Sequence, residues 1–176
     1  MRKLTFGVAN SLDNYVARPD GAVDWLLWSD EVTEIMTGFW RTIDTLVMGR
    51  KTYEAALKHG GGSNPYRGVK TYVFSRTYEA GQHPGVEIVR DDAAQFVREL
   101  KAGDGKDICL MGGGDLARPL FEADLIDEVG VNIHPVLLGE GVPLFHQMER
   151  QINLALVEHR VLRTNCVYLL YRVVRD

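Results

Sequence analysis

The sequence predicts an α/β fold, with a mostly parallel mixed sheet, helices on both faces and a C-terminal antiparallel hairpin. Up to about residue 125, short β-branched and apolar runs alternate with segments of helical period, which is typical of parallel sheets. Beyond that point, strand follows strand. The last two predicted strands, Leu154–Leu162 and Cys166–Val174, are separated only by Arg163-Thr164-Asn165, a connection so short that they must run antiparallel.

The first half of the chain begins with a strand and reaches its first helix at Ser29-Asp30-Glu31. A helix is expected there because the apolar residues that follow recur at helical spacing. The breaker-rich run from Gly60 to Pro65 predicts a mobile surface loop. The expected elements are strands or extended pieces at residues 3–9, 15–17 and 45–48, and helices from Ser29 to about Trp40 and from Lys51 to Lys58.

The second half continues the alternation of strand and helix. Asp91 or Asp92 is expected to cap a helix, because a carboxylate accepts the free N–H groups of a first helical turn. The expected elements are strands at Val69–Phe74, Val86–Val89, Asp107–Met111 and Ile126–Ile133, and helices that end near Leu100 and Glu122.

Composition indicates one ordinary globular domain over residues 1–176, with 45% hydrophobic residues and a formal net charge of −4. The basic residues form no stripe, so we expect no nucleic-acid partner. Cys109 and Cys166 lie in apolar runs, which suits buried thiols in a reducing cytosol, and neither has a metal-ligand neighbour. The segment Met1–Val8 leads into no long hydrophobic stretch, so we expect no membrane segment and a cytoplasmic protein.

The most informative stretch is Thr45–Glu54, where a strand runs into Gly49-Arg50-Lys51-Thr52 at the start of a helix. Glycine permits a tight strand exit, and two cations and a hydroxyl then stand beside the free N–H groups of the helix. This arrangement favours an anion. A solvated basic turn is the alternative interpretation of the same residues.

A second strand exit of this kind follows Met111. Gly112-Gly113-Gly114-Asp115-Leu116 leaves backbone N–H groups unshielded at the start of a helix, where a pyrophosphate can approach the main chain. A plain flexible turn is the alternative. Neither loop fits the Rossmann or P-loop pattern. Both loops are expected at the carboxyl ends of parallel strands, where α/β folds bind ligands, and this agreement favours phosphate binding.

Four segments resemble the dihydrofolate reductase-like family, and specifically the reductase domain of the riboflavin-biosynthesis deaminase-reductases. These are Ser11–Ala17, Thr45–Glu54, Met111–Leu116 and the run from Pro135 to Phe145. The last is the most specific, with the pattern Pro-x-x-Leu-Gly-x-Gly-x-Pro-Leu-Phe. Asn14 replaces a glycine that is common in the family. The resemblance implies a dihydrofolate reductase-like three-layer sandwich, and it covers nearly the whole chain without any zinc deaminase pattern, which predicts a stand-alone reductase.

The resemblance further implies NADPH as the hydride donor. The expected cofactor-binding residues fall into three groups. Gly49, Arg50 and Lys51, with Ser75 and Arg76, would hold the adenosine 2′-phosphate; Thr52 with Gly112, Gly113, Gly114, Asp115 and Leu116 would hold the pyrophosphate; Val16 and Ala17 would line the nicotinamide. Independently of the family, guanidinium groups suit a 2′-phosphate because they bind it through paired donors.

Hydride transfer also requires a proton for the reduced substrate. Asp30 and Glu34 are the candidate catalytic residues, because dihydrofolate reductases place a buried carboxylate near the start of this helix. An ungapped comparison instead places an apolar or Thr residue there, and acidic residues in a first turn are favoured by the helix dipole alone. Trp25 is the preferred wall of a pocket for a planar substrate, although core packing is the commoner role of such aromatics.

The expected function is therefore an NADPH-dependent reductase of a planar heterocycle. The family implies either the ribosylamino-pyrimidine phosphate of riboflavin synthesis or a pterin such as dihydrofolate. The alternatives are a non-catalytic NADPH-binding module and a reductase of an unrelated small molecule. The apolar strand Cys166–Val174 also predicts pairing of an exposed sheet edge into a homodimer.

Overall fold

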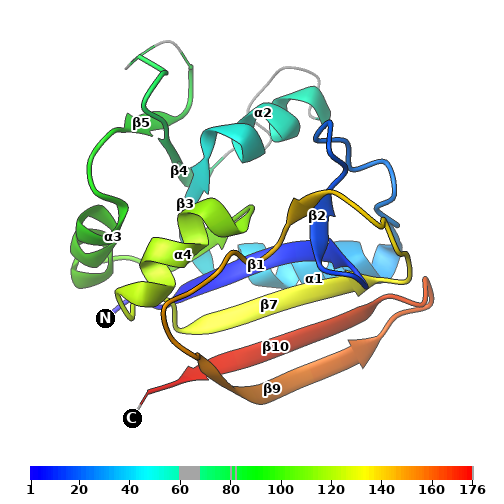
Figure 1. The fold of residues 1–176 in the computed structure, drawn as a ribbon. Coiled ribbons are helices and arrows are strands. Elements are labelled where there is room, and N and C mark those ends of the chain that lie inside the picture. Colours follow the sequence, from blue (N-terminus) through cyan, green and yellow to red (C-terminus); the bar gives the residue numbers. More distant parts are fainter. Residues whose placement is uncertain (60–67, 80, 82, 176) are drawn as a thin grey trace.

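The computed structural model of the chain describes residues 1–59, 68–79, 81 and 83–175 (Figure 1). These residues form a large sheet, a small two-stranded sheet and helices that cover the large sheet. The strands are β1 Leu4–Ser11, β2 Tyr15–Ala17, β3 Ile43–Gly49, β4 Lys70–Phe74, β5 Glu87–Val89, β6 Asp107–Met111, β7 Glu128–His134, β8 Val142–Pro143, β9 Asn153–Val161 and β10 Val167–Val174. The helices are α1 Asp30–Trp40, α2 Arg50–His59, α3 Ala93–Ala102 and α4 Gly114–Glu122.

The large sheet has eight strands in the order β5-β4-β3-β6-β1-β7-β10-β9. From β5 to β7 every neighbouring pair is parallel. Strand β10 runs antiparallel to both β7 and β9, so the C-terminal hairpin extends one edge of the sheet. The predicted fold class, a mostly parallel mixed sheet with a C-terminal antiparallel hairpin, is confirmed.

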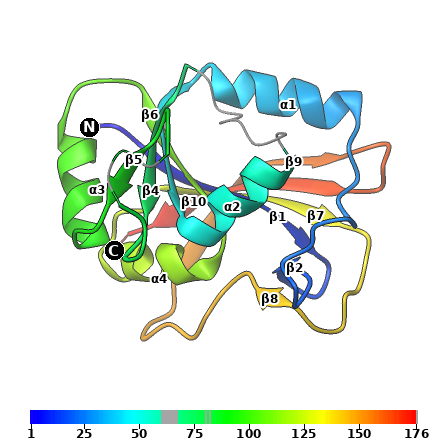
Figure 2. The same ribbon diagram turned by 90° about the horizontal axis from the view of Figure 1, so that it is seen from above.

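Alternate residues of the central strands face different helices. In β3, Val47 packs in the core cluster that includes residues of α3 and α4, whereas Leu46 and Met48 pack in a second cluster with residues of α1 and α2. The same alternation in β6 sends Ile108 and Cys109 to opposite layers. Helices therefore cover both faces of the sheet, as Figure 2 shows for α1 on one side and α3 and α4 on the other.

The predicted caps and element ends agree closely with the structure. The Ser29 side chain accepts the N–H of Val32 at 3.3 Å and so caps α1. The Asp92 carboxylate accepts the N–H of Gln95 at 2.8 Å and caps α3. The surface loop predicted for Gly60–Pro65 lies outside the described residues.

One pair of strands was not expected from the sequence. β8, inside the run from Pro135 to Phe145, pairs with β2 as a separate two-stranded sheet. A Cβ added at Gly141 would lie only 2.3 Å from the carbonyl oxygen of Ala17, so glycine is needed for this close approach. The pairing holds the loop after β7 against β2.

Strand β9 forms the exposed edge of the large sheet at its antiparallel end. Most of its residues are exposed, including Leu154, Leu156, Val157 and Val161. The expectation that Cys166–Val174 is an exposed edge is wrong, because β10 pairs with β7 on one side and with β9 on the other. Among the helices of the described part of the chain, none is long and apolar enough to cross a membrane.

Candidate functional site

The two predicted anion loops, Gly49–Thr52 and Gly112–Leu116, lie side by side at the carboxyl ends of the parallel strands. Strands β3 and β6 are parallel neighbours, with Met48 paired to Met111 in register. Each strand therefore ends next to the other, and each runs directly into a helix, α2 in one case and α4 in the other. The structure thus brings together two segments that are about sixty positions apart in the sequence.

Gly112 and Thr52 form the contact between these loops. A Cβ added at Gly112 would lie 2.2 Å from Thr52 Oγ1 and 3.0 Å from Thr52 Cβ. Gly112 also has a φ of +119°, which side-chain-bearing residues rarely adopt. Close packing and backbone conformation therefore both require glycine, and the Thr52 hydroxyl is held against the glycine loop.

Helix α4 begins at the glycine loop without a side-chain cap. Gly113 is its N-cap residue and supplies no side-chain hydrogen bond, so the first N–H groups of a nine-residue helix are left to another acceptor. Gly114 is covered by the chain, because an added Cβ would lie 2.5 Å from the carbonyl oxygen of Leu144. The exposed Asp115 carboxylate lies 3.0 Å from His146 Nε2. An uncapped N-terminus beside glycines fits the pyrophosphate expected here.

Strand β2 lies next to the same loop. A Cβ added at Gly113 would stand in ordinary contact, 3.8 Å from Val16 Cγ2. Ala17 is buried and pairs with Val142 of β8. Residues predicted to line the nicotinamide and residues predicted to hold the pyrophosphate are therefore neighbours in the structure.

The predicted cations lie in different surroundings. Arg50 Nη1 donates to Glu54 Oε1 at 2.7 Å across one turn of α2. Lys51 and Arg76 are exposed, and no hydrogen bond or ion pair joins either of them to another described residue. Ser75 is buried, and its Oγ accepts the backbone N–H groups of Thr77 at 3.2 Å and Tyr78 at 3.0 Å. Among the described residues, Arg50 is therefore held by a carboxylate, and Lys51 and Arg76 have no such partner.

The candidate proton donors both lie on the exposed side of α1. Asp30 and Glu34 are exposed, and the buried residue of this helix is Val32. Between them, Glu31 has a different role, because its Oε2 accepts the backbone N–H of Arg163 at 2.7 Å and so ties α1 to the hairpin turn. The roles of Asp30 and Glu34 stay predictions.

Trp25 is buried and belongs to a polar cluster that the sequence did not indicate. Its ring meets His134 edge-on, with 5.3 Å between the centroids, and its indole N–H has no hydrogen-bond partner among the described residues. His134 Nδ1 accepts the N–H of Leu27 at 3.1 Å and lies 3.4 Å from Cys166 Sγ. Burial lowers the pKa of His134 and so favours the neutral ring, and the side-chain amide nitrogen of Asn132 lies 3.2 Å from His134 Nε2.

This cluster joins three segments that lie far apart in the sequence, around Trp25, His134 and Cys166. Its only sequence signal was the position of His134 immediately before the Pro135–Phe145 run. No spacing rule links that histidine to a tryptophan more than a hundred positions earlier. Among the described residues, no group of three or more His, Cys, Asp or Glu side chains could hold a metal ion.

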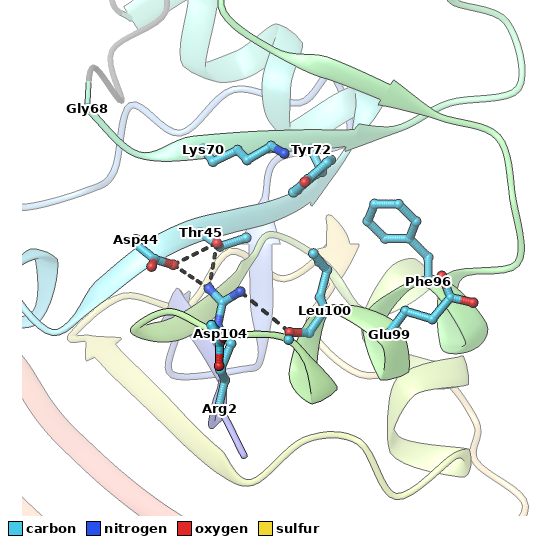
Figure 3. A pocket seen from close by; sticks show the side chains of 11 residues that line it. Arg2, Asp44, Thr45, Gly68, Lys70, Tyr72, Phe96, Glu99, Leu100 and Asp104 are labelled. Carbon is cyan, nitrogen blue, oxygen red and sulfur yellow. Dashed lines mark hydrogen bonds and ion pairs between the residues drawn. The ribbon is translucent and has the colours of Figure 1, made fainter.

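A cavity of about 610 Å³ lies by the amino ends of β3 and β4, at the end of the sheet that faces away from the two loops (Figure 3). Arg2 points into it and forms an ion pair with Asp44. The same guanidinium donates to Thr45 Oγ1 at 2.6 Å and to the carbonyl oxygen of Leu100 at 3.5 Å. The buried charge of Arg2 is already paired, and both anion loops lie at the carboxyl ends of the strands. We therefore place the candidate site at the carboxyl ends.

The sequence model of the RibD C-terminal domain family matches residues 2–168 of the chain. The chain belongs to the RibD C-terminal domain family. The resemblance seen in the four sequence segments is thereby confirmed. Membership supports a reductase-type fold and oxidoreductase chemistry in general.

Two individual proteins are similar to this RibD C-terminal domain over most of its length. The chain is 35% identical over 156 residues to the uncharacterized protein YwjB of Bacillus subtilis (strain 168), a match covering 88% of this chain and 89% of that protein. The crystal structure of a protein from Shewanella sp. PV-4, named for riboflavin biosynthesis, matches with a TM-score of 0.85 and 29% identity, over 99% of this chain and 100% of that one.

A third likeness shows the fold alone. The Thermotoga maritima diaminohydroxyphosphoribosylaminopyrimidine deaminase/5-amino-6-(5-phosphoribosylamino)uracil reductase matches with a TM-score of 0.72 at 16% identity. The match covers 98% of this chain and 57% of that protein. The RibD C-terminal domain described here therefore has the fold of part of a two-activity protein.

Proposed function

We propose that this protein is an NADPH-dependent reductase that transfers a hydride to a planar heterocycle. The observation that carries the proposal is the contact between Thr52 and Gly112, which joins two anion loops beside the uncapped N-terminus of α4. Family membership supports a reductase, and the loops support a phosphate-bearing cofactor. The substrate classes we propose are a ribosylamino-pyrimidine phosphate and a pterin such as dihydrofolate.

The cofactor, when bound, supplies the hydride, so the chain has to bind, orient and exclude water. Arg50, Lys51 and Arg76, with Ser75, would hold the 2′-phosphate. Thr52 and the N–H groups of the loop Gly112–Leu116 would hold the pyrophosphate. Val16 and Ala17 of β2 would lie along the nicotinamide, because β2 stands next to the glycine loop.

The substrate would lie near Trp25, whose buried indole N–H is left for an acceptor. Asp30 and Glu34 remain the proposed sources of the proton. Because both side chains are exposed, either residue would have to deliver its proton from the solvent-exposed side of the site. Substituting each by its amide would identify the donor, because loss of a proton donor lowers kcat by roughly 10²–10⁴-fold while cofactor binding is kept.

A titration with NADPH and with NADH, followed by tryptophan fluorescence, tests the cofactor. We expect NADPH to bind more tightly, and Arg50→Ala to weaken NADPH binding far more than NADH binding. Arg98→Ala is the matched control, since it removes an exposed arginine from α3, away from both loops. Absence of binding by either nucleotide would overturn the proposal.

Turnover is tested by incubating the protein with NADPH and each candidate substrate, while the absorbance of the cofactor is recorded. Oxidation with the pyrimidine phosphate or the pterin supports the reductase. Selective binding of NADPH without oxidation by either would instead favour the second candidate, a non-catalytic NADPH-binding module or a reductase of an unrelated small molecule. The exposed positions of Asp30 and Glu34 favour that alternative.

We also propose that the protein is cytoplasmic and forms a homodimer. Both cysteines are buried free thiols, which suits a reducing compartment. The exposed edge strand β9 carries Leu156, Val157 and Val161, with exposed fractions of 54, 58 and 76%. Light scattering after gel filtration should give twice the 19.8 kDa chain mass, and Val157→Lys should give the monomer. A wild-type monomer would refute the dimer.

A further inference from the structure

A carboxylate stands at the proposed 2′-phosphate site, and the sequence did not indicate its role. Glu54 lies one turn after Arg50 on α2 and accepts Arg50 Nη1 at 2.7 Å. The same oxygen, Oε1, accepts the Tyr78 hydroxyl at 2.7 Å. The Arg50 guanidinium carbon lies 6.0 Å from the centroid of the Tyr78 ring. One carboxylate oxygen therefore links the cation to an aromatic ring on the loop after β4.

Tyr78 is fixed independently of this contact. Its ring stacks on His83, with 4.1 Å between the centroids and 25° between the planes. Its backbone N–H donates to Ser75 Oγ at 3.0 Å, and its carbonyl oxygen accepts Arg90 Nε at 3.2 Å. These contacts hold Tyr78 in place, so its hydroxyl can fix the Glu54 carboxylate that pairs with Arg50.

The carboxylate of Glu54 is ionised at neutral pH. Burial acts to raise the pKa of Glu54, but the hydrogen bonds from Tyr78 and Arg50 outweigh it and hold that pKa below its ordinary value. An exposed i,i+4 ion pair contributes little to folding stability. The Arg50–Glu54 pair instead affects ligand binding, because an arginine side chain that is already held in one rotamer loses less conformational entropy when it binds a ligand.

The guanidinium group keeps most of its donors. An arginine has five N–H donors, and among the described residues only Glu54 accepts one from Arg50. Lys51 follows directly in the chain, and Arg76 lies two residues after the end of the neighbouring strand β4, so positive charge near this point exceeds the charge of Glu54. A phosphomonoester dianion would therefore meet oriented donors with a net positive surrounding.

We propose that Glu54 is a positioning residue for the cofactor 2′-phosphate, holding Arg50 against Tyr78 so that its remaining N–H groups face the phosphate. This inference rests on the proposed function, because it assumes that NADPH binds at this edge. It differs from the competing idea that Glu54 repels the phosphate and selects NADH. The two ideas predict opposite effects of removing the carboxylate.

The test compares the dissociation constants of NADPH and NADH for wild type, Glu54→Ala and Glu54→Gln. We expect Glu54→Ala to weaken NADPH binding by about 5–10-fold and NADH binding by less than about 2-fold, since only NADPH carries the phosphate. Glu54→Gln keeps a hydrogen-bond acceptor for Arg50 and Tyr78, so it should restore most of the NADPH affinity. If the role of Glu54 were merely structural, its removal would raise the dissociation constants of NADPH and NADH by similar factors.

Two further variants sharpen the result. Tyr78→Phe removes only the hydroxyl that meets Glu54, so NADPH binding should weaken by about 2–3-fold. Glu122→Ala is the matched control, because it breaks the i,i+4 pair of Arg118 Nε and Glu122 Oε1, 3.0 Å apart at the far end of α4. It should leave both dissociation constants unchanged.

The outcomes separate this inference from the proposed function. If wild type binds NADPH selectively and Arg50→Ala abolishes that selectivity, the proposed cofactor site stands. Unchanged or tighter NADPH binding by Glu54→Ala would then overturn the positioning role alone. If wild type binds neither nucleotide, the proposed function fails and this inference fails with it.

Discussion

Replacement of Gly112 by alanine is the sharpest test of how the two loops fit together. The added Cβ would lie 2.2 Å from Thr52 Oγ1, 3.0 Å from Thr52 Cβ and 3.1 Å from Thr52 Cγ2. Threonine is branched at Cβ, so turning the hydroxyl away leaves the methyl group or Cβ itself in the way. The backbone at Gly112, with φ of +119°, adds strain for any side-chain-bearing residue.

The expected loss of stability follows from these two terms. A sparsely populated backbone conformation costs roughly 1–3 kcal/mol, and overpacking of a well-packed site costs roughly 1–3 kcal/mol. A total of about 3 kcal/mol should lower Tm by about 6–12 °C in a domain of this size. That is a large part of a typical stability of about 5–15 kcal/mol.

Thermal and urea unfolding should be measured for Gly112→Ala beside Gly113→Ala. Gly113 has a φ of −84°, and its added Cβ would stand 3.8 Å from Val16 Cγ2, an ordinary contact. Alanine lowers the conformational entropy of the unfolded chain, which stabilises the fold, but it is a poorer N-cap residue than glycine. The two effects should nearly cancel, so the free energy of unfolding of Gly113→Ala should lie within about 1 kcal/mol of wild type. Thr52→Ala in the Gly112→Ala chain should recover about 1 kcal/mol. Equal stability of the two alanine variants would refute the reasoning.

Two further predictions concern an ion-paired carboxylate and a buried thiol. Burial acts to raise the pKa of Asp127, but hydrogen bonds from Lys101, the Leu4 N–H and Arg175 outweigh it and hold that pKa below its ordinary value. Asp127 therefore stabilises the fold above its unfolded-state pKa, and this contribution is lost as pH falls through the folded-state pKa. Urea unfolding from pH 7 to 3 should show a steeper loss for wild type than for Asp127→Asn, and equal slopes would contradict this. Burial raises the pKa of the Cys109 thiol to about 12, so native protein at pH 8 should leave it unmodified by a maleimide that labels it fully in urea; rapid native labelling, located by peptide mass, would contradict its burial.

The elements of the fold were predictable because their signals are local. Ser29 and Asp92 cap the helices that they were expected to cap, and the three-residue turn at Arg163 allows only an antiparallel hairpin. β8 was missed because a two-residue strand has no periodicity to detect. Its pairing depends on Gly141, whose lack of a side chain matters only once Ala17 lies opposite.

The candidate site was predictable in its loops and less so in its partners. Gly49–Thr52 and Gly112–Leu116 could be found because glycine after a strand and before a helix has few other roles. That Glu54 and Tyr78 would meet Arg50 could not be found, because Tyr78 lies 24 positions beyond Glu54 on a different element. The cluster around His134 was hidden for the same reason.

Local sequence sets where this chain forms strands, helices and glycine turns, because alternation, caps and turn residues act over a few positions. Strand order and register belong to the folded chain, since they depend on which distant segments pack together. Only the tertiary structure therefore decides that Thr52 touches Gly112, that Arg50 pairs with Glu54, and that Trp25 lies against His134. These contacts form when parallel strands bring their carboxyl ends to one edge of the sheet.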